Sequence, residues 1–560
     1  MSTYRKFFLT LSFFAVVWFF PQEFLPNEFK NWLYEYVGEP DFKPASESMP
    51  ASIPPLDVQQ VCPQRFADWR KAQTIAGVDI RASAACVPDN PYDIAVAVRG
   101  GNNVSESVLM GSLLNPDAVE KSDDRDGDGD PDLIKIRLEV MELNGHSPDM
   151  EQVVPEFEIA PGLTPGAWVF APKGKGMTTL NFESNRANRN VRLPAPVIRV
   201  EQGDTVELTL ENTHYLPHTI HLHGVDHPFQ RKDGGGNDGV PLFSEHPVEP
   251  GAARTYIFTP REPGTGFYHC HVQPHTHILM GLQGMLIVED ARSNNLLQTL
   301  NVGGGEVRVP SQGVSSDYSQ EYDLHYFELD ENLNNRIQQD MDPRIISRSV
   351  HRGYNITQRV PQYFLLNGRS FPYTLLESMV IVRKNQKTLL RTLNGGSEGM
   401  ALHFHGHKPK LLSRDGVSLQ SSDKRDGFWL PPASRADLVL DTTDNGLDSF
   451  GAGVWMLHDH REKAVTTDGI GPGGNVSMVI YDEYLDESGL PPTVHGQQGL
   501  SLFFNDAYYR GEIPVFTGMG MPYLDEPDKT RGIYYELWFF VVALSVFFIA
   551  ALWPKKRSNW

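Results

Sequence analysis

The chain has 560 residues, which is enough for about two to four domains of ordinary size. Hydrophobic residues make up 40% and charged residues 21%, so the composition excludes a wholly disordered chain. A net charge of −21 argues against nucleic acid and against an anionic lipid surface as the main partner. The 49 glycines and 41 prolines favour a turn-rich β protein over a helical bundle.

Both ends of the chain carry membrane signals. Residues 1–24 hold an apolar run after Arg5 and Lys6, and we predict a membrane anchor or signal there, with an uncleaved anchor favoured because no small-residue cleavage site follows. Residues 534–554 are predicted to be a transmembrane helix, because an uncharged apolar run precedes a basic cluster. Everything between them is then expected on the outer, periplasmic or extracellular, face of the cytoplasmic membrane.

The three cysteines are interpreted in the light of that compartment. Outside the membrane the environment is oxidising, so Cys62 and Cys86 are predicted to form a disulfide within the irregular extension 25–130. Cys270 is left unpaired, and its role decides the function.

The extension ends in an acidic loop with aspartates at alternate positions around glycines. Such carboxylates can wrap a calcium ion, although the bidentate glutamate of an EF-hand is replaced by Lys135. A solvated acidic turn is the alternative. The candidate calcium ligands are Asp124, Asp126, Asp128, Asp130 and Asp132.

Two regions then read as strands with period-2 alternation between turns of glycine, proline and asparagine. They predict an all-β fold of two Greek-key sandwiches, residues 131–292 and 320–490, joined by a linker at 293–319 and followed by an extension at 491–533. The predicted strands are Leu133–Leu143, Pro196–Val200, Thr205–Glu211, Ala253–Phe258 and Gly284–Val288 in the first region, and Tyr322–Leu329, Met379–Val382, Thr388–Leu393, Arg435–Leu440 and Val476–Tyr481 in the second.

The two regions are copies of one another. The stretch LPHTIHLHG at 216–224 recurs as GMALHFHG at 399–406, and FYHCH at 267–271 recurs as MLHDH at 456–460. Each copy thus contains two His-x-His pairs, and residues i and i+2 of a strand point to the same face. Eight imidazoles from four strands suit a cluster of borderline metals such as copper. They are His221, His223, His269, His271, His403, His405, His458 and His460.

The first copy carries a second set of donors. Cys270 lies between two of the paired histidines, so its side chain points to the opposite face of the strand. His218 precedes the first pair, and His275 and Met280 follow Cys270 by five and ten residues. Two imidazoles, a thiolate and a weak thioether are the ligands of a blue-copper electron-transfer site.

These motifs, H-x-x-H-L-H-G and H-C-H-x-x-x-H-x-x-x-x-M, resemble those of the multicopper oxidases, the family of laccases, ascorbate oxidase and ceruloplasmin. The resemblance covers about residues 130–485 and implies two cupredoxin-like domains. It implies four coppers per chain: one type-1 copper on His218, Cys270, His275 and Met280, and one type-2 and two type-3 coppers on the eight paired histidines.

The second copy lacks the blue-copper ligands. Met400, Asp459, Ala464 and Gly469 stand at the four corresponding positions. The chain therefore resembles the two-domain members with type-1 copper in the first domain, which implies a homotrimer whose clusters are shared between subunits. The stretch DGVPLFSEHPVEPG also resembles a family segment beside the cluster, and it makes Asp238 the candidate proton donor.

The resemblance implies an oxidase that takes one electron at a time at type-1 copper and reduces dioxygen to water at the trinuclear site. Copper nitrite reductase is the first alternative, but it needs fewer histidines and lacks one at the position of His271. A non-catalytic electron carrier is the second, although it needs only the Cys270 site. The reductant stays open among metal ions, phenols and small redox proteins. His227, His246, His277 and His407 lie outside the ligand pattern and are interpreted as neighbouring or surface residues.

Overall fold

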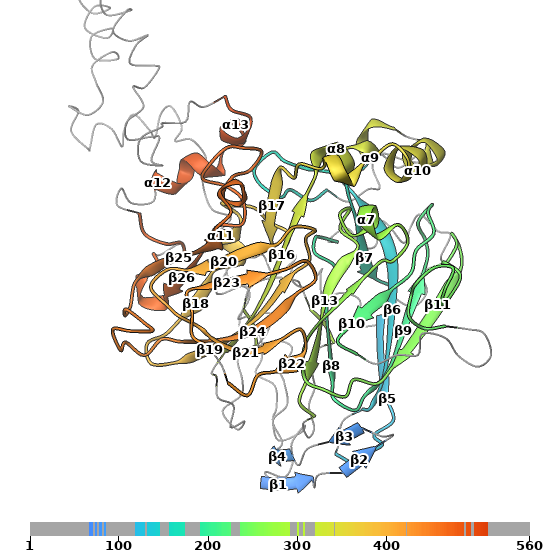
Figure 1. The fold of residues 1–560 in the computed structure, drawn as a ribbon, viewed down its shortest axis with the longest axis horizontal. Coiled ribbons are helices and arrows are strands. Elements are labelled where there is room, and N and C mark those ends of the chain that lie inside the picture. The colour runs from blue at the N-terminus through green and yellow to red at the C-terminus, as the bar shows by residue number, and fades with distance from the viewer. Residues whose placement is uncertain are drawn as a thin grey trace, which may run out of the picture. The chain divides into compact units, whose positions relative to one another are not determined.

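The structure is a computed structural model of the chain (Figure 1). It describes residues 67–70, 73–75, 78–80, 83–85, 118–128, 131–145, 156–173, 191–225, 236–291, 299–301, 306–308, 318, 320–340, 342–421, 423–486, 489–493 and 498–512. The elements discussed here all belong to one compact unit, residues 45–510.

The first domain is a sandwich of two sheets. One sheet has the order β10 (His221–His223), β12 (Gly264–His269), β13 (Gln283–Glu289), β8 (Val197–Glu201) and β14 (Leu300–Asn301). The other has the order β11 (Ala253–Phe258), β9 (Thr205–Glu211), β6 (Leu133–Leu143) and β5 (Val119–Ser122), with β7 (Ala167–Pro172) also paired to β6. A short helix, α7 (Pro274–His277), follows β12.

The second domain repeats this plan. One sheet has the order β15 (Glu306–Arg308), β16 (Gln320–Leu329), β19 (Lys387–Asn394), β24 (Arg435–Asp441), β21 (Lys410–Arg414) and β22 (Val417–Ser418), with β17 (Tyr363–Leu366) paired to β16. The other has the order β18 (Val380–Val382), β26 (Ser477–Tyr481), β25 (Val454–Asp459), β20 (Met400–Phe404) and β23 (Gly427–Leu430). Each sheet of each domain contains one parallel pair, so the duplication extends to the topology.

The alternation of side chains explains these sheets. In β9 every second residue is buried and the residues between are partly exposed, as expected for a strand with one face on the core. All the residues of β13 and β16 are buried. One face of each strand packs on the core of its own domain, and the other face is covered by the other domain or by loops beside it. The predicted all-β architecture of two sandwiches is confirmed, and the ten predicted strands agree with β6, β8, β9, β11, β13, β16, β18, β19, β24 and β26 to within a few residues at each end.

The two domains meet at a buried cluster of charges. Arg199 of β8 pairs with Glu289 (2.7 Å), Glu321 (3.1 Å) and Asp323 (2.6 Å), and the last two belong to β16 of the second domain. Arg391 of β19 pairs with Glu321 at 2.8 Å. The arginines are at most 8% exposed and these three acids at most 1%. The pairs therefore cross the domain boundary and cannot be exchanged for water without separating the domains.

Two features depart from the predicted domain plan. The predicted linker 293–319 contains β14, which extends a sheet of the first domain, and β15, which begins a sheet of the second. Residues 331–359, here called the helical insert, form α8 (Glu331–Asn334), α9 (Arg336–Gln339), α10 (Pro343–His351) and a 3-10 turn η4 (Ile356–Gln358) between β16 and β17. The insert belongs to the second copy in sequence, but its apolar side chains join the core of the first domain: Leu333, Ile337, Ile346 and Val350.

The extensions are described only in part. Residues 67–85 form two small sheets, β1 (Ala67–Arg70) with β4 (Ser83–Ala85) and β2 (Gln73–Ile75) with β3 (Val78–Ile80). Short helices α12 (Gln498–Ser501) and α13 (Asp506–Tyr509) follow the second domain. The described residues include no helix that is long and apolar enough to cross a membrane. The predicted anchors at 1–24 and 534–554, and the predicted disulfide between Cys62 and Cys86, lie outside the described residues.

Candidate metal centres

Cys270 occupies the residue after β12 and is buried and unpaired. Its Sγ lies 3.6 Å from Nδ1 of His218 and 3.4 Å from Nδ1 of His277. The three ligand atoms lie within 4.8 Å of one another, and all three residues are buried. Sequence reasoning found Cys270 and His218 through their spacing, and the structure brings these two together.

The third member differs from the predicted one. His277, interpreted above as lying outside the ligand pattern, faces Cys270 in place of His275. Pro274 begins α7, preceded by Gln273 in a left-handed conformation (φ 45°), and residues two apart on a helix point to different faces. His277 is therefore turned inward, whereas His275 is only partly buried. Met280 is fully buried in the same apolar core as Cys270.

Further imidazoles extend this site in two directions. Nε2 of His218 lies 2.9 Å from Nδ1 of His214, whose ring packs edge-on against Trp168. On the other side, Nε2 of His277 lies 2.8 Å from Nε2 of His351, the last residue of α10 in the helical insert. The rings of His277 and His351 stack with centroids 5.0 Å apart. A row of four imidazoles and one thiol thus runs from the interior of the first domain to the insert.

The interior keeps these groups uncharged. Burial, and then the charges of neighbouring imidazoles, hold the pKa of His218 and of His277 well below the ordinary value. Burial also raises the pKa of the Cys270 thiol to about 12. Both rings are therefore neutral at physiological pH and offer lone pairs, which is the form in which histidine binds metals.

The opposite face of the sheet carries the first quartet: His221 and His223 of β10, His269 at the end of β12, and His271 two residues beyond it. His221 and His269 are direct partners in the ladder between β10 and β12. Nε2 of His223 lies 3.0 Å from Nε2 of His269, and these two residues form a candidate metal group with His221. The ring of His271 lies 5.2 Å from that of His221, centre to centre. The quartet predicted from the two His-x-His pairs is thus gathered at one place.

The second quartet, His403, His405, His458 and His460, has the same arrangement. His403 and His458 are partners in the ladder between β20 and β25. Nε2 of His405 lies 3.3 Å from Nε2 of His458, and the rings of His403 and His460 lie 5.3 Å apart. His405 and His460 are exposed, so this quartet opens to the surface of the chain.

Backbone carbonyls fix the orientation of two rings in each quartet. Nδ1 of His221 lies 2.6 Å from the carbonyl oxygen of Asp238, and Nδ1 of His403 lies 3.1 Å from that of Asp426. Nδ1 of His269 and of His458 each face the carbonyl of the following residue at 3.0 Å. A proton held at Nδ1 leaves Nε2 as the free donor, which is how outer hydrogen bonds prepare a metal-binding histidine.

Asp238 also presents its carboxylate to the first quartet. Its Oδ1 lies 3.5 Å from Nδ1 of His221, and the side chain is 18% exposed. Glu245 stands behind it, accepting a hydrogen bond from the amide of Gly239 (3.0 Å) and one from the Tyr256 hydroxyl (2.7 Å). Burial raises the pKa of Glu245. Two carboxylates therefore lie in succession beside the first quartet.

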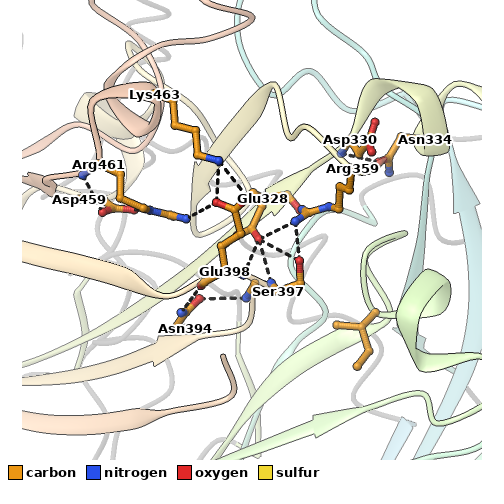
Figure 2. Close-up of polar contacts among 12 residues, drawn as sticks. Glu328, Asp330, Asn334, Arg359, Asn394, Ser397, Glu398, Asp459, Arg461 and Lys463 are labelled. Atoms are coloured by element: carbon orange, nitrogen blue, oxygen red, sulfur yellow. Dashed lines mark hydrogen bonds and ion pairs between the residues drawn. The ribbon is translucent and has the colours of Figure 1, made fainter. Parts of the chain in front are cut away.

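The second domain has a salt-bridge network where the first has Cys270. Asp459 is fully buried, accepts a hydrogen bond from Arg461 Nε at 2.8 Å and one from the amide of Ala401 at 3.1 Å. Figure 2 shows that Arg461 continues to Glu398 (2.7 Å), which also pairs with Lys463. Asp459 thus stands where the first copy has Cys270, as the sequence comparison of the copies predicts.

The acidic loop between β5 and β6 brings three of the predicted calcium ligands together. Asp124, Asp126 and Asp128 bring carboxylate oxygens within 4.8 Å of one another, but Oδ1 of Asp124 accepts the amides of Gly127 and Asp128. Asp132 Oδ2 accepts the amide of Asp126 at 3.1 Å, and Asp130 lies outside the described residues. Calcium binding here stays a prediction.

Comparison with known proteins adds to this geometry. A profile described as "Multicopper oxidase" matches residues 177–293, the segment that holds Cys270 and the first quartet. An "Iron transport multicopper oxidase FET3" of Gibberella zeae is 24% identical over 327 residues, which are 54% of this chain and 46% of that protein. A "Multicopper oxidase VdtB" of Byssochlamys spectabilis is 36% identical over 99 residues, 18% of this chain and 14% of that one.

Residues 177–293 thus form a multicopper oxidase domain. The chain spans less than half the length of the two relatives named above. Among solved structures, the "Blue Copper Oxidase from Nitrosomonas europaea" is 24% identical, with a TM-score of 0.46, and the match covers 68% of this chain and 93% of that one.

The donors at these sites fit copper. One thiol and two imidazole Nδ1 atoms converge in a buried, apolar place, which is the donor set of a blue-copper site. In each quartet, two rings offer an Nε2 atom while a backbone carbonyl faces their Nδ1. Sequence spacing missed His277, His351 and Asp426, because only the local turn of α7, the packing of the insert and the position of the 426–427 turn bring them to the sites.

Proposed function

We propose that this chain is a multicopper oxidase that couples one-electron oxidation of a reductant near Cys270 to four-electron reduction of dioxygen to water at the two quartets. Copper, when bound, supplies the one-electron chemistry at the first site and the binding and reduction of dioxygen at the second. Cys270, His218 and His277 would hold type-1 copper, with Met280 as the axial candidate, and the eight paired histidines would hold one type-2 and two type-3 coppers.

One observation carries the proposal. A single strand end presents Cys270 on one face and His269 and His271 on the other. The carbonyl of Cys270 also accepts the Nδ1 hydrogen bond of His269 at 3.0 Å. The residues of the two sites are therefore joined by two peptide bonds and a hydrogen bond, which supports electron passage between them without any movement of the protein.

Protons for dioxygen reduction need a donor beside the quartets, and Asp238 is our candidate. Its carboxylate lies against His221, and Glu245 stands behind it through the Gly239 amide. Burial raises the pKa of Glu245, so it keeps a proton to higher pH than an exposed glutamate does, and we assign it as a second proton store near Asp238.

We extend the proposal to a homotrimer whose clusters form between subunits. Each quartet supplies four of the eight imidazoles, and the described ring contacts join members of the same quartet. His405 and His460 are exposed in the single chain, so another subunit can cover them. The first quartet of one subunit would then meet the second quartet of its neighbour.

The two alternatives are less well supported. A nitrite reductase would have no use for the full second set of imidazoles, and an electron carrier would need only the residues around Cys270. The quartets are held in matched ladders with matched carbonyl contacts in both domains, which favours a shared multi-metal site over either alternative.

The decisive experiment is to purify the full chain in mild detergent, count copper, and record visible and spin-resonance spectra with oxygen uptake. We expect about four coppers per chain, one blue site, a coupled pair that is silent in spin resonance, and oxygen uptake when a reductant is added. About two coppers, no coupled pair and no oxygen uptake would reject the oxidase and leave nitrite reductase to be tested.

Sharing of clusters can be tested by mixing subunits. His223→Ala and His405→Ala each remove one imidazole from one quartet and leave the other quartet intact, so each protein alone is expected to take up no oxygen. If clusters lie between subunits, trimers reassembled from both variants will regain part of the activity, because some contacts pair two intact quartets. Recovery at the level of either variant alone would reject shared clusters.

Location and calcium complete the proposal. We propose that the copper domains lie on the outer face of the cytoplasmic membrane, anchored through residues 1–24 and 534–554. We also propose that the 124–132 loop binds calcium. Equilibrium dialysis against calcium, with Asp126→Asn as the variant, tests the second point.

A further inference from the structure

The helical insert places one histidine at the outer end of the Cys270 site. His351 ends α10, and its Nε2 lies 2.8 Å from Nε2 of His277, whose other ring nitrogen lies 3.4 Å from the Cys270 sulfur. His277 is fully buried, whereas His351 is partly exposed. Among the described residues of this row, His351 is thus the imidazole that joins the buried site to the surface.

The insert is fixed to both domains. On the first domain, the Asn334 amide donates to the carbonyl of Gly166 (2.8 Å) and the Gln338 amide to that of Thr164 (2.7 Å). On the second, Figure 2 shows Arg359, at the end of the insert, paired with Glu328 of β16 at 3.0 Å. The arginine side chain is 3% exposed and the glutamate 1%. His351 is therefore held in place by a rigid support.

Positive charge surrounds His351 in a strongly acidic protein. The helical insert contains five arginines and three acidic residues, and its last acidic residue is Asp342, which pairs with Arg344 at 2.6 Å. Beyond that pair, Arg348 and Arg352 are exposed. Arg352 and His275 both act electrostatically on His351. The surface at this end of the site is thus basic, whereas the whole chain carries −21.

We propose that His351 is the residue through which electrons reach the Cys270 site, and that the arginines beside it select an anionic small-molecule donor. This inference rests on the proposed oxidase function and names the class of its reductant. The donor would lose one electron, and the acceptor would be a copper(II) ion that Cys270, His218 and His277 would hold, reduced to copper(I). No bond forms or breaks at His351, which conducts through its hydrogen bond to His277.

The relay is tested on the copper-loaded full chain without oxygen, by mixing with ascorbate and following the bleaching of the blue absorption. His351→Leu is expected to slow reduction about tenfold or more and to shift the reduction potential, because an outer hydrogen bond to a ligand is lost. His351→Gln keeps a donor and should restore the potential. Gln358→Ala, on an exposed turn of the same insert, is the control and should behave as the wild type.

The donor class is tested by reversing charge. Ascorbate serves as the anionic donor and hexaammineruthenium(II) as a cationic one. Added salt should slow reduction by ascorbate and hasten reduction by the cation. Arg352→Glu should lower the ascorbate rate about tenfold and raise the cation rate. Arg344→Glu makes the same change in net charge about 12 Å further along the helix and should have a much smaller effect.

The outcomes separate the two proposals. A protein without blue copper or oxygen uptake would overturn both. A protein with both, whose His351→Leu variant is reduced at the wild-type rate and potential, would overturn the relay alone. Faster reduction by the cationic donor at low salt, unchanged in Arg352→Glu, would overturn the anionic donor.

Discussion

The two sandwich domains agree on one face and differ on the other. In both, the first histidine of one pair faces the first histidine of the next across a ladder, and its Nδ1 meets the carbonyl of an aspartate that is followed by a glycine. Neither contact depends on the particular side chains opposite. On the shared face, the backbone therefore orients the imidazoles in the same way in both domains.

The other face shows what one substitution on that frame does. At the end of β12 stands Cys270 with two imidazoles at contact distance, and at the end of β25 stands Asp459 with Arg461. Both residues are fully buried. An aspartate cannot replace a thiolate as a soft copper ligand, and a buried carboxylate needs a cation. The second domain supplies that cation, so the same position changes from a redox site to a structural ion pair.

The largest expected effect comes from removing the thiol. Cys270→Ser should abolish the blue absorption and bring oxidation of the reductant to background, while the quartets keep their copper. The matched change in the other copy, Asp459→Asn, should leave the colour intact. Visible spectra and copper counts of both variants check this, and a blue Cys270→Ser protein would contradict the assignment.

The next effect concerns the shared face. His223→Ala and His405→Ala occupy equivalent places in the two copies, so we expect equal loss of oxygen uptake, with the blue site still reduced by ascorbate in the absence of oxygen. Oxygen uptake and anaerobic bleaching are the measurements. Full oxygen uptake in His405→Ala would mean that only the first quartet works, and the equivalence of the copies would fail.

The sequence predicted the histidine-bearing face, which the two domains share, more completely than the face on which Cys270 and Asp459 differ. The His-x-His pairs follow from strand periodicity alone, and all eight residues lie in the two quartets that were predicted. The Cys270 site depends on a four-residue helix, where a proline start turns His277 inward in place of His275. The insert could not be placed either: its apolar residues predict burial, but nothing local indicates that they pack on the other domain.

A smaller effect is expected for the ion pair of the second domain. Asp459→Ala leaves Arg461 and the Ala401 amide without their buried partner, which should cost about 3 kcal/mol of unfolding free energy. Urea unfolding of the copper-free protein measures it. Lys463→Ala is the control, because its side chain is 46% exposed and its pair with Glu398 should contribute under about 1 kcal/mol. Equal losses of unfolding free energy in the two variants would show that burial of Asp459 does not strengthen the contribution of its ion pair to stability.

The smallest effect concerns the contact between the two copies. Burial, opposed by the charges of Arg199 and Arg391, raises the pKa of Asp323 from 3.8 to about 6. The folded state then binds the proton more tightly than the unfolded state, so this stabilisation is complete below the unfolded pKa and is lost as pH rises toward about 6. Across that range it should decline by about 2 kcal/mol.

Asp323→Asn should remove this decline, which is measured as the difference in unfolding free energy between variant and wild type from about pH 4 to 7. Asp342→Asn is the control. Its pKa is lowered to about 2 by hydrogen bonds from Arg344, so its contribution is already complete in this range. If the difference in unfolding free energy between Asp323→Asn and wild type does not change with pH, then Arg199 and Arg391 neutralise the cluster fully. The two copies would then be joined by balanced charge, without the excess proton affinity that burial of Asp323 implies.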